Sequence, residues 1–189
     1  MTGPFTLRPA VPADSLCLSV LAMQVFLDTY ATEGIRPAIA REVLSSYSEA
    51  AMAQALGNTT VDRLIVAERA ADRPGGEAHL LGFAHLRLGQ RHTLLADEAR
   101  PQAELLRLYV QEPATGQGLG RRLLGAAEAR VAEWSGGTPA LLWLTAWVHN
   151  RRALGFYAAQ AYVDRGLTHF EFEGETHENR LLAKACPAA

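Results

Sequence analysis

The strongest constraint on the fold is a stretch in which a strand-like segment is followed by three alternating glycines and then by a helical pattern. Residues 104–111, ELLRLYVQ, are mostly apolar and are followed by Glu112-Pro113, and proline cannot donate a hydrogen bond to a sheet. The glycines come next, in TGQGLGRR, and apolar residues then recur at helical spacing, at Leu119, Leu123, Ala127, Val131 and Trp134. The sequence predicts a strand, a glycine loop and a helix, in that order.

This glycine loop is suited to an anion. Glycines let a ligand approach backbone N–H groups closely, and the first turn of a helix offers unpaired donors with a partial positive charge. Arg121 and Arg122 stand at that turn, where each cation opposes the helix dipole by about 0.3–1 kcal/mol and a bound anion would reverse the sign. We therefore interpret the loop as a phosphate site.

Two common phosphate loops fit these residues poorly. A nucleotide-hydrolase loop needs lysine followed by serine or threonine, and Arg121-Arg122 stand there instead, which excludes it. A dinucleotide loop needs a third glycine where Arg121 stands, and an acidic residue after the next strand, where the chain has His149-Asn150. An NAD-dependent oxidoreductase is the less favoured alternative.

The residues RLYVQEPATGQGLGRRLL resemble the acetyl-CoA motif of the GCN5-related N-acetyltransferase (GNAT) family, which is a strand, a proline and Arg/Gln-x-x-Gly-x-Gly/Ala opening a helix. Gly118 and Gly120 match the glycines of that motif, whereas Thr115 departs from its usual Arg or Gln. Further along, VHNRRALGFYAAQAYVDRG resembles the family's Asn-x-x-Ala-x-x-Phe-Tyr segment, with four residues in register: Asn150, Ala153, Phe156 and Tyr157. The two motifs cover residues 104–166 in the family's order.

One further departure concerns the end of that second helix. The family usually has Gly-Phe there, and this chain has Ala161-Tyr162. If the position needs a positive φ, alanine is unfavourable, because only glycine adopts that conformation without strain.

The resemblance implies a GNAT-like α/β (α+β) fold with a central mixed, mostly antiparallel sheet of six to seven strands, flanked by about four helices, in a single N-acetyltransferase domain over residues 1–189. It also implies acetyl-CoA as co-substrate. The pantetheine arm and thioester would lie along the backbone of Leu108, Tyr109 and Val110. The loop that would hold the pyrophosphate comprises Thr115, Gly116, Gln117, Gly118, Leu119, Gly120 and Arg121, and Arg121 alone of the two arginines is assigned to phosphate.

Acetyl transfer to an amine also needs groups that move protons. By the same resemblance, Tyr157 is the candidate general acid, since a phenol with a pKa near 10 can protonate a leaving thiolate; its spacing alone also suits a core tyrosine. Asn150 would hydrogen-bond the cofactor arm or cap the following helix, or do both. Glu104 is the candidate base, acting through water, with His85 and His149 as alternatives. Each of these three also has a purely structural interpretation.

The acceptor is predicted to be a primary amine of a small molecule or a peptide. A weaker resemblance of AELLRLYV and FLDTYATEG to the polyamine acetyltransferase-like branch favours a polyamine-like compound. The first two helices would cover the substrate side with Asp28, Tyr30, Glu33 and Tyr47, because carboxylates beside aromatic rings suit a cationic amine. The same residues also fit the polar edge of a core helix. A non-catalytic acyl-CoA binding or sensing module is the main alternative function.

The composition of the chain limits the kinds of partner and the compartment that we expect. The 18 Lys and Arg against 20 Asp and Glu give a net charge of −2, so no overall basic field attracts nucleic acid. Cys17 and Cys186 are too few for a disulfide framework and favour a reducing compartment, with Cys17 expected in the core. No apolar run is long enough to span a membrane, and no signal peptide is evident. We expect a cytoplasmic protein that needs no metal, membrane or nucleic acid, and leave a homodimer open.

Apolar periodicity predicts the remaining elements. Residues 5–8 are expected to form a strand, and residues 14–30 a helix whose core face carries Leu16, Val20, Met23, Leu27 and Tyr30. A second helical stretch, with breaks, runs from Pro37 to Gly57. Further expectations are a hairpin of residues 61–68 and 79–88, an exposed loop at 90–102, a buried central strand at 139–148 parallel to the strand before it, a helix at 151–160, and strands at 163–172 and 179–183.

Overall fold

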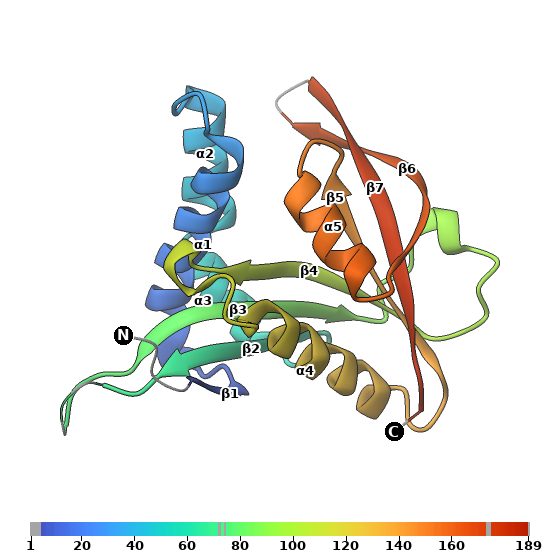
Figure 1. Ribbon diagram of the computed structural model, residues 1–189, viewed down its shortest axis with the longest axis horizontal. Helices are drawn as coiled ribbons and strands as arrows, with labels where there is room; N and C mark the ends of the chain where they lie inside the picture. Colours follow the sequence, from blue (N-terminus) through green and yellow to red (C-terminus); the bar gives the residue numbers. More distant parts are fainter. Residues whose placement is uncertain (1–4, 72, 74, 173–174, 189) are drawn as a thin grey trace. The chain divides into compact units, whose positions relative to one another are not determined.

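The computed structural model describes residues 5–71, 73, 75–172 and 175–188, and its elements are shown in Figure 1. The strands are β1 (Phe5–Pro9), β2 (Asp62–Arg69), β3 (His79–Leu88), β4 (Gln102–Val110), β5 (Ala140–Trp147), β6 (Val163–Phe172) and β7 (Glu175–Cys186). The α-helices are α1 (Ser15–Tyr30), α2 (Pro37–Ser46), α3 (Glu49–Gly57), α4 (Leu119–Trp134) and α5 (Arg151–Ala159). Three short 3-10 helices are η1 (Pro12–Asp14), η2 (Thr93–Leu95) and η3 (Glu112–Ala114).

The chain forms two compact units. The first unit consists of Met1–His85 and Arg107–Ala126, and the second of Leu86–Leu106 and Ala127–Ala189. Three elements, β3, β4 and α4, run along the chain from one unit into the other.

The first unit contains the strand order β1-β2-β3-β4. β1 pairs antiparallel with β2, with Phe5 opposite Arg69, and the arrows of β2 and β3 point in opposite directions, as expected of the predicted hairpin (Figure 1). Its core contains Leu18, Leu21, Ala22, Tyr47, Met52, Leu64, Val66 and Phe83. The helices α1 and α3, with Tyr47 after α2, therefore bury apolar residues together with this part of the sheet.

The second unit continues the order as β4-β5-β7-β6. β5 is parallel to β4, with Gln102 opposite Leu141, and antiparallel to β7, which also pairs antiparallel with β6. Residues 140–144 of β5 are all buried. The predicted buried central strand and its parallel pairing with β4 are confirmed.

The predicted fold class is confirmed, since the helices accompany a mixed seven-stranded sheet. The described residues form five α-helices rather than about four, because the second helical stretch divides at Tyr47-Ser48. The hydroxyl of Ser48 accepts a hydrogen bond from Ala51 N at 3.2 Å and so caps α3 as a separate helix.

The predicted core face of α1 is wrong for three of its five residues, whereas Met23 and Leu27 are partly buried and Met23 packs against the core. Leu16, Val20 and Tyr30 are 56%, 59% and 40% exposed, whereas Leu18, Leu21 and Ala22 are buried. Both stripes have helical spacing, because α1 is apolar on most of its surface, and two serines decide between them. Ser19 is buried and donates to Tyr47 O at 2.6 Å, and Ser15 donates to Glu49 Oε1 at 3.4 Å. Polar residues that bond neighbouring helices thus face inward.

The exposure of several other residues and the length of one strand also differ from expectation. Cys17 is exposed on α1 rather than in the core, and Trp134 is 38% exposed at the end of α4. The loop at 90–102 is not wholly exposed, because the buried Gln102 donates through Nε2 to Leu95 O at 2.9 Å, and Leu95 is buried as well. β7 is longer than predicted at both ends.

Candidate functional site

The glycine loop connects β4 to α4 in the first unit by a tight turn. β4 ends at Val110, η3 follows, and α4 begins at Leu119. Gly116 and Gly118 have φ angles of 74° and 77°, in the left-handed region where a side chain is strained. The shape of the loop therefore requires glycine at these two positions.

The start of α4 leaves backbone donors open. Arg122 N donates to Gly118 O at 3.1 Å, which closes the first turn of the helix. Three N–H groups precede this bond and have no acceptor within the helix, those of Leu119, Gly120 and Arg121. Gly118 has no side chain that could cap them. Donors of this kind and the positive end of a helix dipole are the groups that bind anions at helix starts.

Thr115 and Gln117 hold the loop closed. Thr115 Oγ1 donates to Glu112 O at 2.8 Å, and Gln117 Nε2 donates to Pro113 O at 3.1 Å. Both bonds tie the loop to the η3 turn before it. The departure of Thr115 from the family motif thus has a structural consequence, because the single donor of its hydroxyl is used within the loop.

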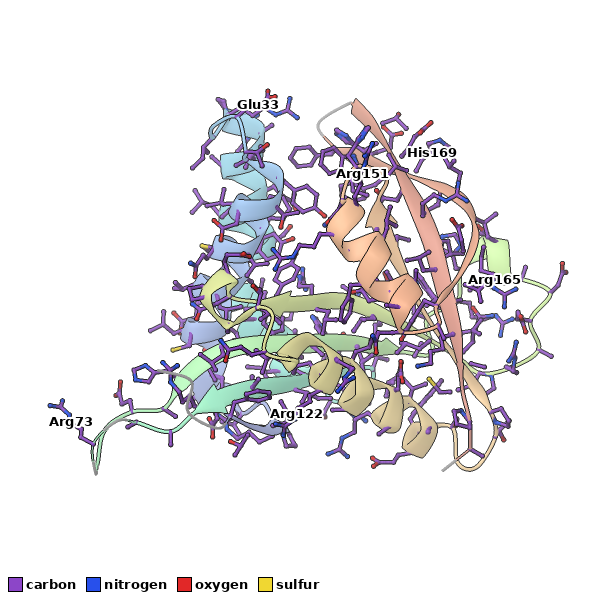
Figure 2. The ribbon with its side chains drawn as sticks, viewed as in Figure 1. Glu33, Arg73, Arg122, Arg151, Arg165 and His169 are labelled. Atoms are coloured by element: carbon purple, nitrogen blue, oxygen red, sulfur yellow. The ribbon has the colours of Figure 1, made fainter. Side chains whose placement is uncertain are left out.

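The two arginines of the loop have different surroundings. The guanidinium carbon of Arg122 lies 4.3 Å from the ring centroid of Phe5, and Figure 2 shows this side chain beside β1. Arg121 is exposed in the first turn of α4, next to the open N–H groups. Arg122 therefore has a structural contact of its own, which agrees with the assignment of phosphate to Arg121 alone.

The second half of β4 is accessible although β4 is an internal strand. Residues 107–110 are each partly exposed, whereas Gln102, Ala103 and Leu105 are buried. β3 approaches this half closely, since a Cβ built on Gly82 would lie 2.5 Å from Tyr109 O. Gly82 thus allows the close approach of the two strands at the residues that were predicted to hold the pantetheine arm.

A buried polar group lies beside this part of β4. His85 Nε2 is 3.0 Å from Asp62 Oδ1, and His85 Nδ1 is 3.0 Å from the Arg107 guanidinium. Arginine can only donate, so Nδ1 accepts, and Nε2 carries the proton that it donates to Asp62. Both ring nitrogens are engaged and His85 is 1% exposed. His85 is therefore not suited to be the general base, which corrects that alternative.

Sequence reasoning missed Arg107. Its signal was a cation inside the apolar run ELLRLYVQ, where an internal strand rarely carries a charge. Arg107 contacts His85 on β3, which in turn bonds to Asp62 on β2, and it lies over the ring of Tyr47, which follows α2. No local pattern could have joined them.

Tyrosines surround the same region of the first unit. The hydroxyls of Tyr47 and Tyr109 are 3.2 Å apart, and the Tyr109 ring packs edge-on against Phe83 with 5.5 Å between centroids. Burial, with the neighbouring Tyr47, raises the pKa of Tyr109 well above that of a free tyrosine. Tyr30 is 40% exposed and packs against Phe26, with 4.7 Å between ring centroids. Of the predicted acceptor residues, Tyr47 and Tyr30 lie in one aromatic cluster around Phe26.

Glu33 lies apart from this cluster. It is exposed in the turn after α1, and Figure 2 shows it at the end of α1 that points away from the strands of the first unit. Asp28 is exposed on α1 as well. The structure therefore groups the two tyrosines without the acidic residues.

The second unit holds Asn150 and Tyr157. Asn150 Oδ1 accepts from Ala153 N at 3.0 Å and caps α5, which confirms the capping interpretation. Tyr157 is buried at 8% exposure, and its ring packs edge-on against Tyr162 with 5.5 Å between centroids. Tyr162 donates to Glu128 Oε1 at 3.2 Å, and Lys184 Nζ lies 2.9 Å from both oxygens of that carboxylate. The position of Tyr157 is thus fixed by a tyrosine that is itself held by an ion pair.

The two remaining candidate bases, Glu104 and His149, differ from each other in burial. Glu104 is partly buried in the second unit, opposite Trp143 of β5. His149 is exposed, and its ring lies edge-on against Trp147 with 5.0 Å between centroids. Glu104 stays the predicted base.

These elements occur in the order that the sequence motifs predicted: an accessible β4, a positive-φ glycine loop at the start of α4, and Asn150 at the start of α5. The model of the Acetyltransferase (GNAT) family matches residues 36–162 of the 189. The chain belongs to the GNAT family. The match includes the glycine loop and the Asn150–Tyr157 segment and excludes α1.

Comparison with individual GNAT proteins shows both sequence and fold similarity. An uncharacterised N-acetyltransferase from the pepI 3' region of Lactobacillus delbrueckii subsp. lactis is 40% identical over 67 residues, which are 35% of this chain and 34% of the relative. The chain thus spans about a third of the length of this curated relative in the matched part. The PaiA N-acetyltransferase of Thermoplasma acidophilum, solved with coenzyme A, superposes with a TM-score of 0.68 at 20% identity over 96% of this chain and 99% of that chain. The spermidine/spermine N-acetyltransferase SpeG of Vibrio cholerae gives 0.60 at 17% identity over 96% and 92%.

Two features of the described residues concern membranes and metals. No helix among them is both long and apolar enough to cross a bilayer. No group of three or more His, Cys, Asp or Glu side chains in that part of the chain is arranged to hold a metal ion.

Proposed function

We propose that this GNAT chain transfers an acetyl group from acetyl-CoA to a primary amine. The start of α4 carries the proposal, because three open N–H groups, two positive-φ glycines and Arg121 meet there. The pyrophosphate of coenzyme A is an anion of the kind that such a helix start binds. The partly exposed backbone of Leu108–Val110 would hold the pantetheine arm. Asn150 is proposed to bind the cofactor as well, through the amide protons that its capping oxygen leaves free to donate.

The proposed chemistry is direct attack. The amine nitrogen attacks the thioester carbonyl carbon, a C–N bond forms, and the C–S bond breaks with its electron pair passing to sulfur. The proton of the amine goes through water to Glu104, and the thiolate takes a proton from the Tyr157 hydroxyl, which regains one from solvent. The products are an amide and the thiol of coenzyme A.

The acceptor is proposed to be a small-molecule amine or a peptide amino group, approached from the side of Tyr30, Glu33 and Tyr47. The solved relative SpeG is a spermidine/spermine N-acetyltransferase, which supports an amine acceptor. We further propose that the chain works in the cytoplasm as a single N-acetyltransferase domain that requires no metal, and we leave a homodimer open.

The test is thiol release from acetyl-CoA in the presence of amines, measured for the wild type and for Tyr157→Phe. The variant should lower kcat by about a hundredfold, because it lacks the proton that a general acid supplies, and should leave the Kd for coenzyme A nearly unchanged. Tyr162→Phe is the matched control, since it removes the hydroxyl of the adjacent buried tyrosine and with it the bond to Glu128. An unchanged kcat for Tyr157→Phe would remove that residue from the mechanism.

The phosphate assignment is tested by binding. Arg121→Ala should raise the Kd for coenzyme A about tenfold, as the loss of a charge-assisted contact does. Arg130→Ala, on the same helix and paired with Glu133 at 2.8 Å, should leave it unchanged. Binding of coenzyme A without turnover of any amine would favour the non-catalytic acyl-CoA module, and binding of NAD in its place would favour an oxidoreductase.

A further inference from the structure

The positively charged guanidinium of Arg107 lies over the ring of Tyr47, a residue that was predicted to bind the acceptor. Its guanidinium carbon lies 4.9 Å from the ring centroid of Tyr47, within the range of a cation–π contact. Phe26 packs against the same ring, with 5.0 Å between centroids. A cationic amine that approached Tyr47 would therefore meet an arginine already in place.

Arg107 has donors to spare. A guanidinium has five N–H donors, and in this structure NH1 alone has a hydrogen-bond partner within the described residues, His85 Nδ1 at 3.0 Å. Within those residues no carboxylate oxygen forms an ion pair with Arg107, whereas Arg8, for example, pairs with both Asp14 and Glu68. Arg107 is only partly buried, so part of the residue is accessible to solvent.

The guanidinium is also fixed in position. His85 holds it through Nδ1 and is held in turn by Asp62, whose second oxygen accepts from Asn58 Nδ2 at 3.0 Å. Asp62 and His85 are 5% and 1% exposed. Buried partners of this kind pre-organise a charged group, which lowers the entropy lost when a ligand binds to it.

Among the described residues, no carboxylate lies directly against the Arg107 guanidinium. Asp62 bonds to the far nitrogen of the imidazole, so a whole ring separates its carboxylate from the guanidinium. Tyr109 stays protonated, because burial beside Tyr47 raises its pKa. At about 5 Å and an effective dielectric constant near 20, a second cation would bind more weakly by roughly a hundredfold. A carboxylate would instead receive two parallel N–H···O bonds from the guanidinium.

Resting on the acetyl transfer proposed above, we propose that the acceptor is an amino-acid-like small molecule and that Arg107 binds the carboxylate it carries beside its reacting amine. Asp62 and His85 are positioning residues for that guanidinium. Polyamines, which lack a carboxylate, are then poor acceptors.

The experiment compares acceptors that differ in the carboxylate alone. Lysine is paired with cadaverine, and phenylalanine with phenethylamine, and thiol release from acetyl-CoA gives kcat/KM for each. The wild type should prefer the amino acid of each pair by at least about tenfold, because one charge-assisted contact is present or absent. Equal kcat/KM within both pairs, or a preference for the decarboxylated amines, would overturn the assignment.

Two variants locate the preference at Arg107. Arg107→Gln keeps a donor for His85 but loses the charge, so it should lower kcat/KM for the amino acids by about ten- to a hundredfold. It should raise kcat/KM for the decarboxylated amines, because their cationic group no longer meets the guanidinium. Arg107→Lys keeps the charge but not the two parallel donors, so it should retain only part of the preference. Thermal unfolding and the Kd for coenzyme A are measured for both variants. A fold defect would lower kcat/KM for all four acceptors together, which distinguishes it from lost recognition of the carboxylate.

The outcomes separate this proposal from the one on which it rests. Thiol release with both members of each pair, but without a preference, rejects carboxylate recognition and leaves acetyl transfer standing. A preference that survives unchanged in Arg107→Gln rejects Arg107 as its source. No thiol release with any amine, by a protein that is folded, rejects acetyl transfer and the acceptor class with it.

Discussion

Ala161 has the single positive φ angle among the non-glycine residues that the structure describes, 64°. It follows α5, where Tyr162 N donates to Tyr157 O at 3.1 Å and closes the end of the helix. Glycine is the residue that usually occupies such a position after a helix, since alanine there is strained by about 1–2 kcal/mol. The sequence predicted strain at Ala161 if its φ were positive, and the φ angle is positive. The strained residue precedes Tyr162, whose ring packs against the candidate acid Tyr157.

Ala161→Gly should relieve this strain. Part of the gain is offset because glycine has more freedom in the unfolded chain, so we expect the free energy of unfolding to rise by roughly 0.5–1 kcal/mol. Urea unfolding measures the change. Ala158→Gly, within the last turn of α5 and exposed, should lower the free energy of unfolding by a similar amount. A decrease for both variants would contradict the strain at Ala161.

Asp14 gives a pH dependence of stability. Arg8 donates to its two oxygens at 2.7 and 2.9 Å, and this bonding, with a bond from Val11 N, lowers the pKa of Asp14 in the folded state. A lowered folded pKa stabilises the protein above the unfolded value of about 3.9, and the contribution is lost as pH falls through the folded pKa. Unfolding of wild type and Asp14→Asn near pH 7, 5 and 3 should show a difference at the two higher values that shrinks near pH 3. A difference that stays constant across the range would contradict it.

Two glycines show how the same substitution should differ between elements. Gly82 of β3 would place a Cβ 2.5 Å from the carbonyl oxygen of Tyr109 on β4, whereas a Cβ on Gly125 of α4 would meet nothing within 4 Å. Gly82→Ala should lower the free energy of unfolding by about 1–3 kcal/mol, because the β4 backbone at Tyr109 must move away from the new Cβ. Gly125→Ala should raise the free energy of unfolding by about 0.5–1 kcal/mol, because alanine favours a helix more than glycine does. Gly82→Ala should also weaken binding of coenzyme A, since it displaces the β4 backbone proposed to hold the pantetheine arm. Unchanged binding with lowered stability would separate the strand contact from the site.

Most elements could be predicted from local patterns, and the failures have physical reasons. The strand, glycine loop and helix of residues 104–134 were predictable because each carries its own local signal. The strand is an apolar run, the loop consists of turn residues, and the helix has apolar residues at helical spacing. The buried face of α1 was not, because its two apolar stripes are alike and the buried one is marked by Ser15 and Ser19, whose partners lie on later helices. The group of Asp62, His85 and Arg107 was hidden for the same reason, since it joins three strands.

At the scale of the whole molecule, the two compact units share secondary structure. β3, β4 and α4 each continue from one unit into the other, so unfolding of one unit would break hydrogen-bonded ladders and a helix that belong to both. A chain built in this way is expected to unfold in one cooperative transition. Such behaviour would support the prediction of a single domain.

The three tryptophans make this expectation testable, because Trp134, Trp143 and Trp147 all belong to the second unit, while the glycine loop belongs to the first. Tryptophan fluorescence thus reports on one unit, and far-ultraviolet circular dichroism on both. Acetyl-CoA at about 100 times its Kd should add about 2.7 kcal/mol of stability and raise Tm by roughly 5–10 °C. With shared strands and a shared helix, both probes should shift together, and NAD should shift neither. A fluorescence midpoint that stays fixed while part of the dichroism transition moves would mean that ligand binding at the glycine loop stabilises the first unit alone.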